Sequence, residues 1–236
     1  MRLLLTRPEL DAERTAAALR ARGHAVVVAP LLRIETLQDA EIGRGPWAAV
    51  LVTSANAVPA IAQHGRFEEL RLLRAFAVGE RSAQALRAAG FTDVSSADGK
   101  VDDLVRVVAR RIKPGEQLLY LAGADRSGDL AAALRVQNLV VRTVVVYRAV
   151  AAETLPAEAA EALSAGVDGV LHFSRRTAAT YVGAARGVGL LIAALNPVHY
   201  CLSAQVAEPL AQAGAVDIRI APRPAEADLI DLIASP

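Results

Sequence analysis

Apolar and polar positions along the chain define two alternating kinds of segment. Short Val- and Leu-rich runs without polar alternation are each followed by Ala-rich stretches whose apolar residues stand three and four positions apart. Such runs are typical of strands in a parallel sheet covered on both faces, and the wider spacing is typical of helices. The alternation predicts an α/β fold of doubly wound parallel sheets with right-handed crossovers. The predicted strands are 2–6, 25–29, 49–53, 75–78, 93–95, 117–121, 140–147, 169–173, 199–202 and 217–220.

The same pattern occurs twice. The phrases VLVTSANAVPAI and VLHFSRRTAATY both place a serine directly after an apolar run, and two further pairs of blocks match in a consistent order. The glycines expected to end equivalent helices, Gly90 and Gly214, coincide in this comparison. The aligned pairs are 50–61 with 170–181, 75–94 with 199–218, and 3–28 with 118–143. We interpret the chain as two similar α/β domains.

Counting strands predicts how the domains divide. A complete set of five strands extends from residue 49 to residue 147, whereas the set that begins at residue 169 lacks two strands. The N-terminus supplies two, and they resemble the last two strands of the complete set. We therefore predict a discontinuous domain, residues 1–33 plus 150–236, with a second domain inserted at 36–146. Linkers near 31–35 and 146–150 should run side by side as two strands.

The charge and cysteine content of the chain limit the kinds of binding partner and the cellular location that we expect. A formal net charge of +1 gives no general attraction to nucleic acid or to an anionic membrane. The longest charge-free run, 187–207, contains an Asn-Pro pair and other polar residues, so we interpret it as helix, turn and buried strand rather than a membrane span. The single cysteine, Cys201, excludes an intrachain disulfide, and a reducing, cytoplasmic location fits.

Candidate ligand-binding residues follow the predicted strands. In open α/β sheets, ligands bind beyond the carboxyl ends of the strands, where small hydroxyl residues leave backbone N–H groups free for anions. The alternative for each serine or threonine is helix capping alone. His172 and Cys201 lie within apolar strands and are interpreted as core residues. The candidates are Arg7, Thr53, Ser54, Ala55, Asn56, Gly79, Glu80, Ser82, Gly123, Arg126, Ser174, Arg175, Ser203, Ala204 and Gln205.

Several common chemistries have no signature here. No Gly-x-Gly-x-x-Gly follows a strand, and the Gly99-Lys100 pair is followed by Val101 rather than by the Ser or Thr of a phosphate-binding loop. Neither a Gly-x-Ser-x-Gly elbow nor metal-ligand spacing of His and carboxylates is present. A nucleotide cofactor, a serine hydrolase and a metalloenzyme are disfavoured.

Taken together, the motifs resemble those of the uroporphyrinogen-III synthase family over essentially the whole chain. The matching phrases, in order, are LLLTRP, VLVTSANAV, AVGERSAQAL, LAGADRSGDLAAALR, VVVYRAV, VLHFSRRTA and CLSAQVAEPL. The resemblance implies two flavodoxin-like domains joined by a two-strand linker, with a ligand cleft between them. It also implies a lyase without cofactor or metal, which cyclises hydroxymethylbilane with inversion of ring D and loss of water in tetrapyrrole and haem biosynthesis.

The resemblance also implies residue roles. Tyr147 matches the linker-side tyrosine proposed to help the hydroxyl leave, while Thr53, Ser54, Asn56 and Ser174 match turn residues that face the substrate. At 203–206 the family's Gly-Pro-x-Thr-like turn is replaced by Ser-Ala-Gln-Val, so Ser203 or Gln205 would have to replace the threonine hydroxyl. We expect a monomer whose only ligand is a linear tetrapyrrole polycarboxylate, handed over by the preceding pathway enzyme.

Two alternatives keep the fold without this activity. A non-catalytic two-lobed ligand-binding protein would share the paired domains and the double linker, although such proteins are usually exported. An inactive paralogue of the family would also fit, given the changed turn at 203–206. Fold alone does not separate these from the enzyme.

Overall fold

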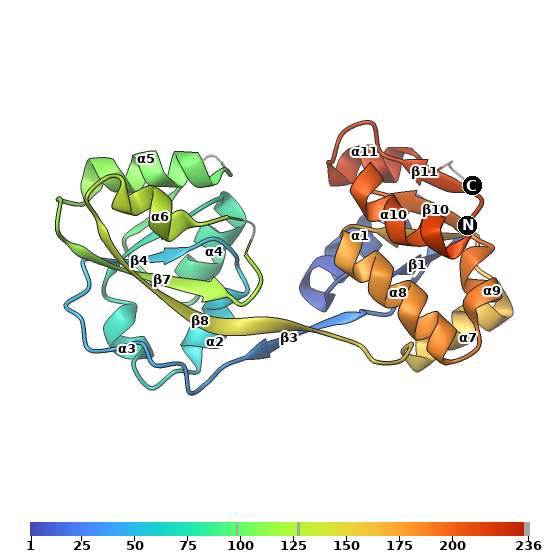
Figure 1. The fold of residues 1–236 in the computed structure, drawn as a ribbon, viewed down its shortest axis with the longest axis horizontal. Coiled ribbons are helices and arrows are strands. Elements are labelled where there is room, and N and C mark those ends of the chain that lie inside the picture. The colour runs from blue at the N-terminus through green and yellow to red at the C-terminus, as the bar shows by residue number, and fades with distance from the viewer. Residues whose placement is uncertain (98, 127, 234–236) are drawn as a thin grey trace. The chain divides into compact units, whose positions relative to one another are not determined.

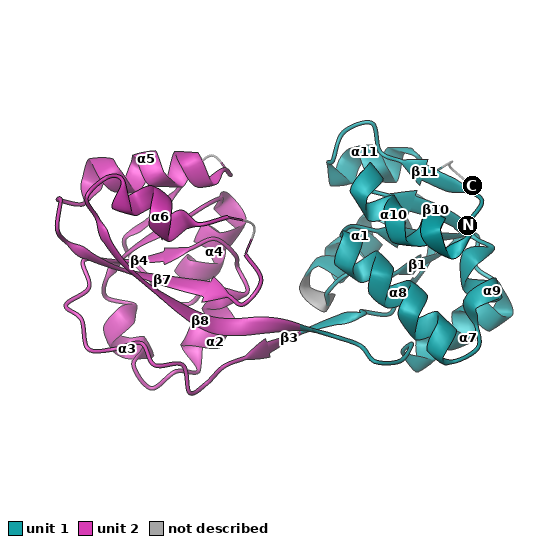
Figure 2. Cartoon of the chain, in the orientation of Figure 1, with its two compact units in different colours: residues 1–33, 150–236 teal, residues 34–149 magenta. Residues whose placement is uncertain are grey.

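The computed structural model describes residues 1–97, 99–126 and 128–233. The chain divides into two compact units, which are described separately (Figure 2). Unit 1 comprises residues 1–33 and 150–236, and unit 2 comprises residues 34–149. Both units are α/β structures built on a largely parallel sheet (Figure 1), so the fold class predicted from the hydrophobic pattern is confirmed.

Unit 1 contains a parallel five-stranded sheet in the order β11-β10-β9-β1-β2. Its strands are β1 (Arg2–Leu5), β2 (Ala25–Val28), β9 (Gly169–His172), β10 (Val198–Cys201) and β11 (Ile218–Ile220). Its helices are α1 (Glu9–Ala21), α7 (Ala157–Ala165), α8 (Arg175–Gly187), α9 (Leu191–Leu195), α10 (Ala204–Ala213) and α11 (Glu226–Asp231). Helices α7 to α10 pack on one face of the sheet, and α1 and α11 pack on the other.

Unit 2 contains a six-stranded sheet in the order β3-β8-β7-β4-β5-β6. Its strands are β3 (Leu32–Thr36), β4 (Ala49–Val52), β5 (Arg74–Ala77), β6 (Val94–Ser96), β7 (Gln117–Gly123) and β8 (Val140–Ala151). Its helices are α2 (Ala57–Ala62), α3 (Phe67–Leu70), α4 (Glu80–Ala88), α5 (Val101–Arg111) and α6 (Leu130–Arg135). Helices α2 to α4 cover one face, and α5 and α6 cover the other.

The internal repeat reappears in the strand order. The strand order β2-β1-β9-β10-β11 in unit 1 corresponds to the order β8-β7-β4-β5-β6 in unit 2. Each strand takes the same position in its sheet as the strand with which the sequence comparison aligned it. The matched glycines Gly90 and Gly214 both adopt positive φ, +96° and +100°, as helix-ending glycines do. The two units are therefore similar in structure as well as in amino-acid sequence.

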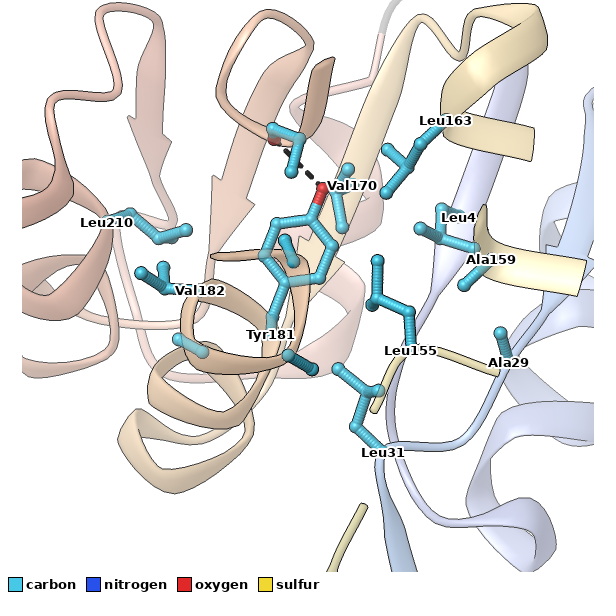
Figure 3. Packing of buried hydrophobic residues seen from close by; sticks show 14 of the residues in the cluster. Leu4, Ala29, Leu31, Leu155, Ala159, Leu163, Val170, Tyr181, Val182 and Leu210 are labelled. Atoms are coloured by element: carbon cyan, nitrogen blue, oxygen red, sulfur yellow. Dashed lines mark hydrogen bonds between the residues drawn. The ribbon is translucent and has the colours of Figure 1, made fainter. Parts of the chain in front are cut away.

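Each unit has a core on both faces of its sheet. In unit 1 the side chains of Leu4 and Val170 point to the α7–α10 face, where they belong to the same cluster as the fully buried ring of Tyr181 (Figure 3). Cys201 belongs to this cluster as well. The Tyr181 hydroxyl donates a hydrogen bond to the Ala194 carbonyl at 2.9 Å, so this phenol is satisfied inside the core. Burial on both faces explains why the strands are apolar without alternation.

Two of the four histidines are fully enclosed in the core of unit 1. His172 and His199 are fully buried on adjacent strands, with 3.1 Å between His172 Nε2 and His199 Nδ1. Burial lowers the pKa of His172 well below its usual value and lowers that of His199 to about 4. Cys201 is buried beside them, and burial raises the pKa of its thiol to about 12. The interpretation of His172 and Cys201 as core residues is confirmed.

Strands β3 and β8 are hydrogen-bonded neighbours, and both run across the division between the units. The Leu37 N–H donates to the Val146 carbonyl at 2.8 Å, and the Ala152 N–H donates to the Leu31 carbonyl at 2.9 Å. The charge-free run 187–207 forms the end of α8, then α9, a turn, β10 and the start of α10. Among the residues described, no helix is long and apolar enough to cross a membrane.

Candidate active site

A cavity of about 290 Å³ lies at the carboxyl edge of the sheet in unit 2. Its wall comes mainly from the turns after β4 and β7, which are adjacent strands whose connections leave in opposite directions along the sheet. Ligands of open α/β sheets bind at such a switch point. Five of the residues expected to contact a ligand line it together: Thr53, Ser54, Gly123, Arg126 and Tyr147.

The ring of Tyr147 is seated over a glycine. β7 pairs with β8 in regular register as far as Ala122, after which an irregularity places Gly123 opposite Tyr147, and the Ala124 N–H donates to the Tyr147 carbonyl at 2.9 Å. A Cβ atom at Gly123 would lie 2.6 Å from Tyr147 Cζ and 2.7 Å from its hydroxyl oxygen. Only glycine therefore allows the phenol to stand where it does.

Thr53 and Tyr120 form a hydroxyl pair in the same wall. The Thr53 Oγ1 lies 2.8 Å from the Tyr120 hydroxyl oxygen, and the Tyr120 side chain comes from the middle of β7. Burial raises the pKa of Tyr120, which outweighs the opposing effect of the Thr53 hydrogen bond. Tyr120 therefore stays protonated at neutral pH and can donate. Its apolar surroundings in the strand offered no signal from which its place at the site could be predicted.

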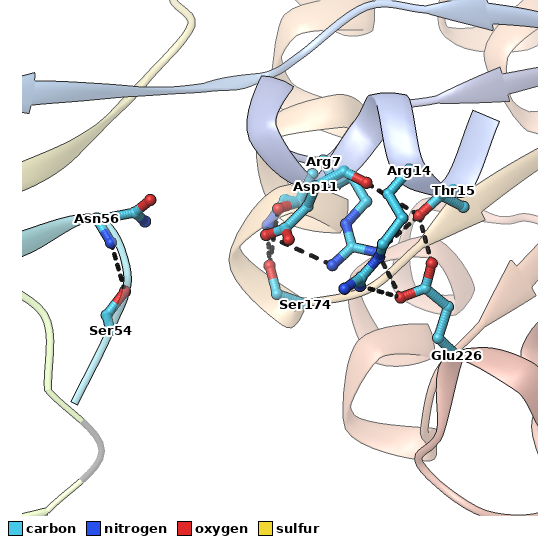
Figure 4. A network of polar contacts seen from close by, with 9 residues as sticks. Arg7, Asp11, Arg14, Thr15, Ser54, Asn56, Ser174 and Glu226 are labelled. Atoms are coloured by element: carbon cyan, nitrogen blue, oxygen red, sulfur yellow. Dashed lines mark hydrogen bonds and ion pairs between the residues drawn. The ribbon is translucent and has the colours of Figure 1, made fainter. Parts of the chain in front are cut away.

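Ser54 shapes the turn after β4. Its Oγ accepts a hydrogen bond from the Asn56 N–H at 3.2 Å (Figure 4). Its carbonyl accepts one from the Ala57 N–H. This is a side-chain-closed turn of the kind that serine favours. Ala55 and Asn56 belong to the turn without lining the cavity.

The turn after β5 contributes differently from the prediction. Gly79 has extended backbone before α4, and a Cβ there would lie 3.6 Å from Gly99 Cα, so its lack of a side chain is not forced by this contact. Glu80 pairs with Arg87 at 2.8 Å on the surface, and Ser82 is buried in α4. Among the described lining residues, this turn is represented by Val78 and by the facing Gly99 instead.

Arg7 in unit 1 is held by other residues of its own unit. Its Nη1 lies 3.1 Å from a carboxylate oxygen of Glu226 and donates to the Thr15 hydroxyl at 2.9 Å (Figure 4). Its Cζ stands 4.1 Å from the centre of the Phe173 ring. Asp11 adds a contact at 3.5 Å. The guanidinium therefore ties the turn after β1 to α1 and α11.

Glu226 is the centre of this network. It accepts the Thr15 hydroxyl at 2.5 Å and pairs with Arg14 at 2.8 Å in addition to Arg7. Partial burial raises the pKa of its carboxyl, but the Thr15 hydrogen bond and the charges of Arg7 and Arg14 outweigh burial and hold the pKa below its ordinary value. An internal carboxylate thus occupies the donors that the sequence suggested for a ligand.

The other predicted positions of unit 1 lie at helix starts. Ser174 caps α8, accepting the Thr177 N–H at 3.1 Å, with its Oγ 2.7 Å from the Thr177 hydroxyl. Arg175 pairs with Glu208 at 3.0 Å. Ser203 precedes α10 in extended conformation, and in the part of the chain that the structure describes its side chain forms no cap hydrogen bond. Ala204 and Gln205 are exposed in the first turn of that helix.

A family profile described as Uroporphyrinogen-III synthase HemD matches residues 13–231. The chain belongs to the uroporphyrinogen-III synthase family. The resemblance seen in the ordered motifs is thereby confirmed. No group of three or more His, Cys, Asp or Glu side chains that could hold a metal ion occurs among the described residues.

Solved structures of the uroporphyrinogen-III synthase family share the fold. A uroporphyrinogen-III synthetase from Helicobacter pylori is 16% identical, with 98% of each chain covered and a TM-score of 0.65. A mutant uroporphyrinogen III synthase from the extreme thermophile Thermus thermophilus is 18% identical, with 98% of this chain and 97% of that chain covered and a TM-score of 0.51. No curated protein gives a significant match.

Proposed function

We propose that this chain is a uroporphyrinogen-III synthase, a lyase that converts linear hydroxymethylbilane to uroporphyrinogen III with inversion of ring D and release of water. The observation that carries the proposal is the Tyr147 phenol, seated over Gly123 in a switch-point cavity of a chain that belongs to this family. Loss of water followed by ring closure needs no net oxidation or reduction, so side chains alone can supply the chemistry.

The first step is departure of the hydroxyl. The C–O bond of the hydroxymethyl group breaks while the adjacent pyrrole nitrogen donates its electron pair toward that carbon. A phenol that gives its proton to the departing oxygen makes the leaving group water rather than hydroxide. Tyr147 is the proposed proton donor. Ring D bonds first through the carbon that already carries its bridge to ring C; that bridge bond then breaks and re-forms at the other α carbon of ring D. The proton lost from this second carbon as the pyrrole regains aromaticity restores the Tyr147 phenol. Substrate and product then differ by one water.

Ring closure at the substituted carbon of ring D is mainly a matter of holding the chain folded. The acetate and propionate groups provide the handles. In unit 2 we assign them to Thr53, Ser54 and Arg126 on the cavity wall, with the backbone N–H groups of the turn after β4. In unit 1 the candidates remain Ser174, Arg175, Ser203 and Gln205, whereas Arg7 already has the Glu226 carboxylate as partner.

The test is a coupled assay in which hydroxymethylbilane is generated in place and the type I and type III products are separated. Wild-type protein should yield the type III isomer. Tyr147→Phe should fold normally and lower kcat by about 10- to 10³-fold, the range of general-acid contributions. Tyr200→Phe is the matched control, because this buried phenol in unit 1 has no hydrogen-bond partner among the described residues.

The outcomes separate enzyme from binding protein. Wild-type protein that binds the bilane yet releases only the type I isomer would refute the proposed activity. Full turnover by a folded Tyr147→Phe variant would remove this phenol from the mechanism and leave the activity intact. A lower thermal midpoint with unchanged single-turnover rate would make Tyr147 structural.

A further inference from the structure

A second cavity, of about 470 Å³, adjoins the first in unit 2. The two share Tyr120, Arg126, Gly128 and Leu130 in their walls, so they are neighbours on either side of these residues. The second cavity is extended by Arg135 at the end of α6 and by Thr143 on β8. Its lining is polar in character, and neither the mechanism nor the predicted site residues, apart from Arg126, make use of it.

Two arginines and one carboxylate line this second cavity. Within the described part of the chain, Arg126 and Arg135 form no ion pair, whereas arginines elsewhere on unit 2, such as Arg74 with Asp93, do. The carboxylate is that of Asp129, whose Oδ1 accepts the Ala132 N–H at 2.9 Å and so caps α6. The cavity therefore contains two positively charged side chains that form no ion pair with the described residues around it.

We infer that this second cavity is a carboxylate subsite, in which Arg135 and Arg126 receive an acetate or propionate side chain of the ligand whose reacting carbon lies beside Tyr147. A planar guanidinium matches a carboxylate with two parallel N–H donors, which suits it to this role. Side chains on one pyrrole ring carry carboxylates in different directions, so adjacent cavities can receive them together. The identity of the ligand rests on the proposed function, but recognition requires only the carboxylate.

The experiment compares Arg135→Gln with Arg110→Gln. Arg110 is likewise an exposed arginine of unit 2 that forms no ion pair in the described residues, but it stands on α5 away from both cavities. Both changes remove one positive charge. In bilane turnover, Arg135→Gln should raise KM about 3- to 10-fold at low salt with kcat within about twofold, and added salt should shrink the difference. Arg135→Lys should recover part of the loss.

A second measurement does not depend on turnover. Quenching of uroporphyrin III fluorescence reports equilibrium binding of a polycarboxylate, and Arg135→Gln should weaken it by about the same factor while Arg110→Gln leaves it unchanged. If wild-type protein fails to turn over the bilane but shows this Arg135-dependent binding, the subsite stands and the proposed function falls. Equal effects of the two glutamine variants, or none from Arg135→Gln in either measurement, would overturn the subsite.

Discussion

Acidification should destabilise unit 1 well before carboxylates titrate, because of the buried His172–His199 pair. The folded pKa of His199 is about 4, whereas an unfolded histidine titrates near 6.5. Between these values the unfolded chain binds a proton that the folded chain does not. The contribution of the neutral histidines to the free energy of unfolding is therefore fully present above pH 6.5, and it is lost as the pH drops toward 4.

The size of the effect follows from the two pKa values. At pH 5 the linkage relation gives a loss of about 2 kcal/mol for His199 relative to pH 7.5, and His172 adds a loss in the same direction. Asp217 and the Leu195 carbonyl partly oppose burial in setting the pKa of His199. His24, also in unit 1 and buried, has a lowered pKa and adds to the same trend.

Two natural reporters allow each unit to be followed in urea. Trp47 is the only tryptophan and lies in unit 2, which contains a single histidine, His64. Cys201 is the only cysteine and is buried in unit 1, so its reaction with a pyridyl disulfide reports opening of that unit. The urea concentration at the midpoint reported by Cys201 should be lower at pH 5 than at pH 7.5. The midpoint reported by Trp47 should change much less.

One substitution tests whether the histidine pair causes this pH dependence. His199→Asn retains a side-chain group that can hydrogen-bond His172 but does not titrate, so the pH dependence of the Cys201 midpoint should drop by roughly half. His64→Asn serves as the control and should leave that dependence unchanged. A wild-type midpoint that is the same at pH 7.5 and 5, or a dependence that survives His199→Asn in full, would refute the assignment of the effect to this pair.

Three further substitutions, one of them with a matched control, test the sites described. Gly123→Ala should reduce kcat as much as Tyr147→Phe does in the bilane assay, because its Cβ would lie 2.6 Å from the Tyr147 ring and displace it, and an unchanged kcat would contradict this packing. Ser174→Ala should lower the urea stability of unit 1 by about 1 kcal/mol, as loss of a helix cap does, with only a modest loss of turnover. Glu226→Gln should lower the free energy of unfolding by about 1–3 kcal/mol, because it weakens the ion pairing of the partly buried Arg7. Glu208→Gln, which loosens an exposed pair, should change it by less than about 1 kcal/mol.

Much of the fold could be predicted because burial on both faces leaves unbroken apolar runs in the sequence. The strands around Val50 and Val170 were found this way, and the repeat fixed which strand matches which. The end of β8 could not be placed, since the strand continues to Ala151 beside β3, which lies more than 100 residues earlier in the chain. Likewise, the sequence marks Tyr147 and Arg126 through local motifs. It carries no mark of Tyr120 or of the pairing between Arg7 and Glu226, because these depend on segments far apart in the chain.

The insertion of unit 2 into unit 1 has a consequence for how the chain emerges during synthesis. Residues 34–149 are continuous, so unit 2 has all its strands once its own last residue has been made. β1, in contrast, lies between β2 and β9, and β9 is translated only after the whole of unit 2. The apolar residues Leu3, Leu4 and Leu5 must therefore wait for their partner while more than half the chain is built. Of the strands described, β1 leaves the ribosome before the others and is among the last to be buried.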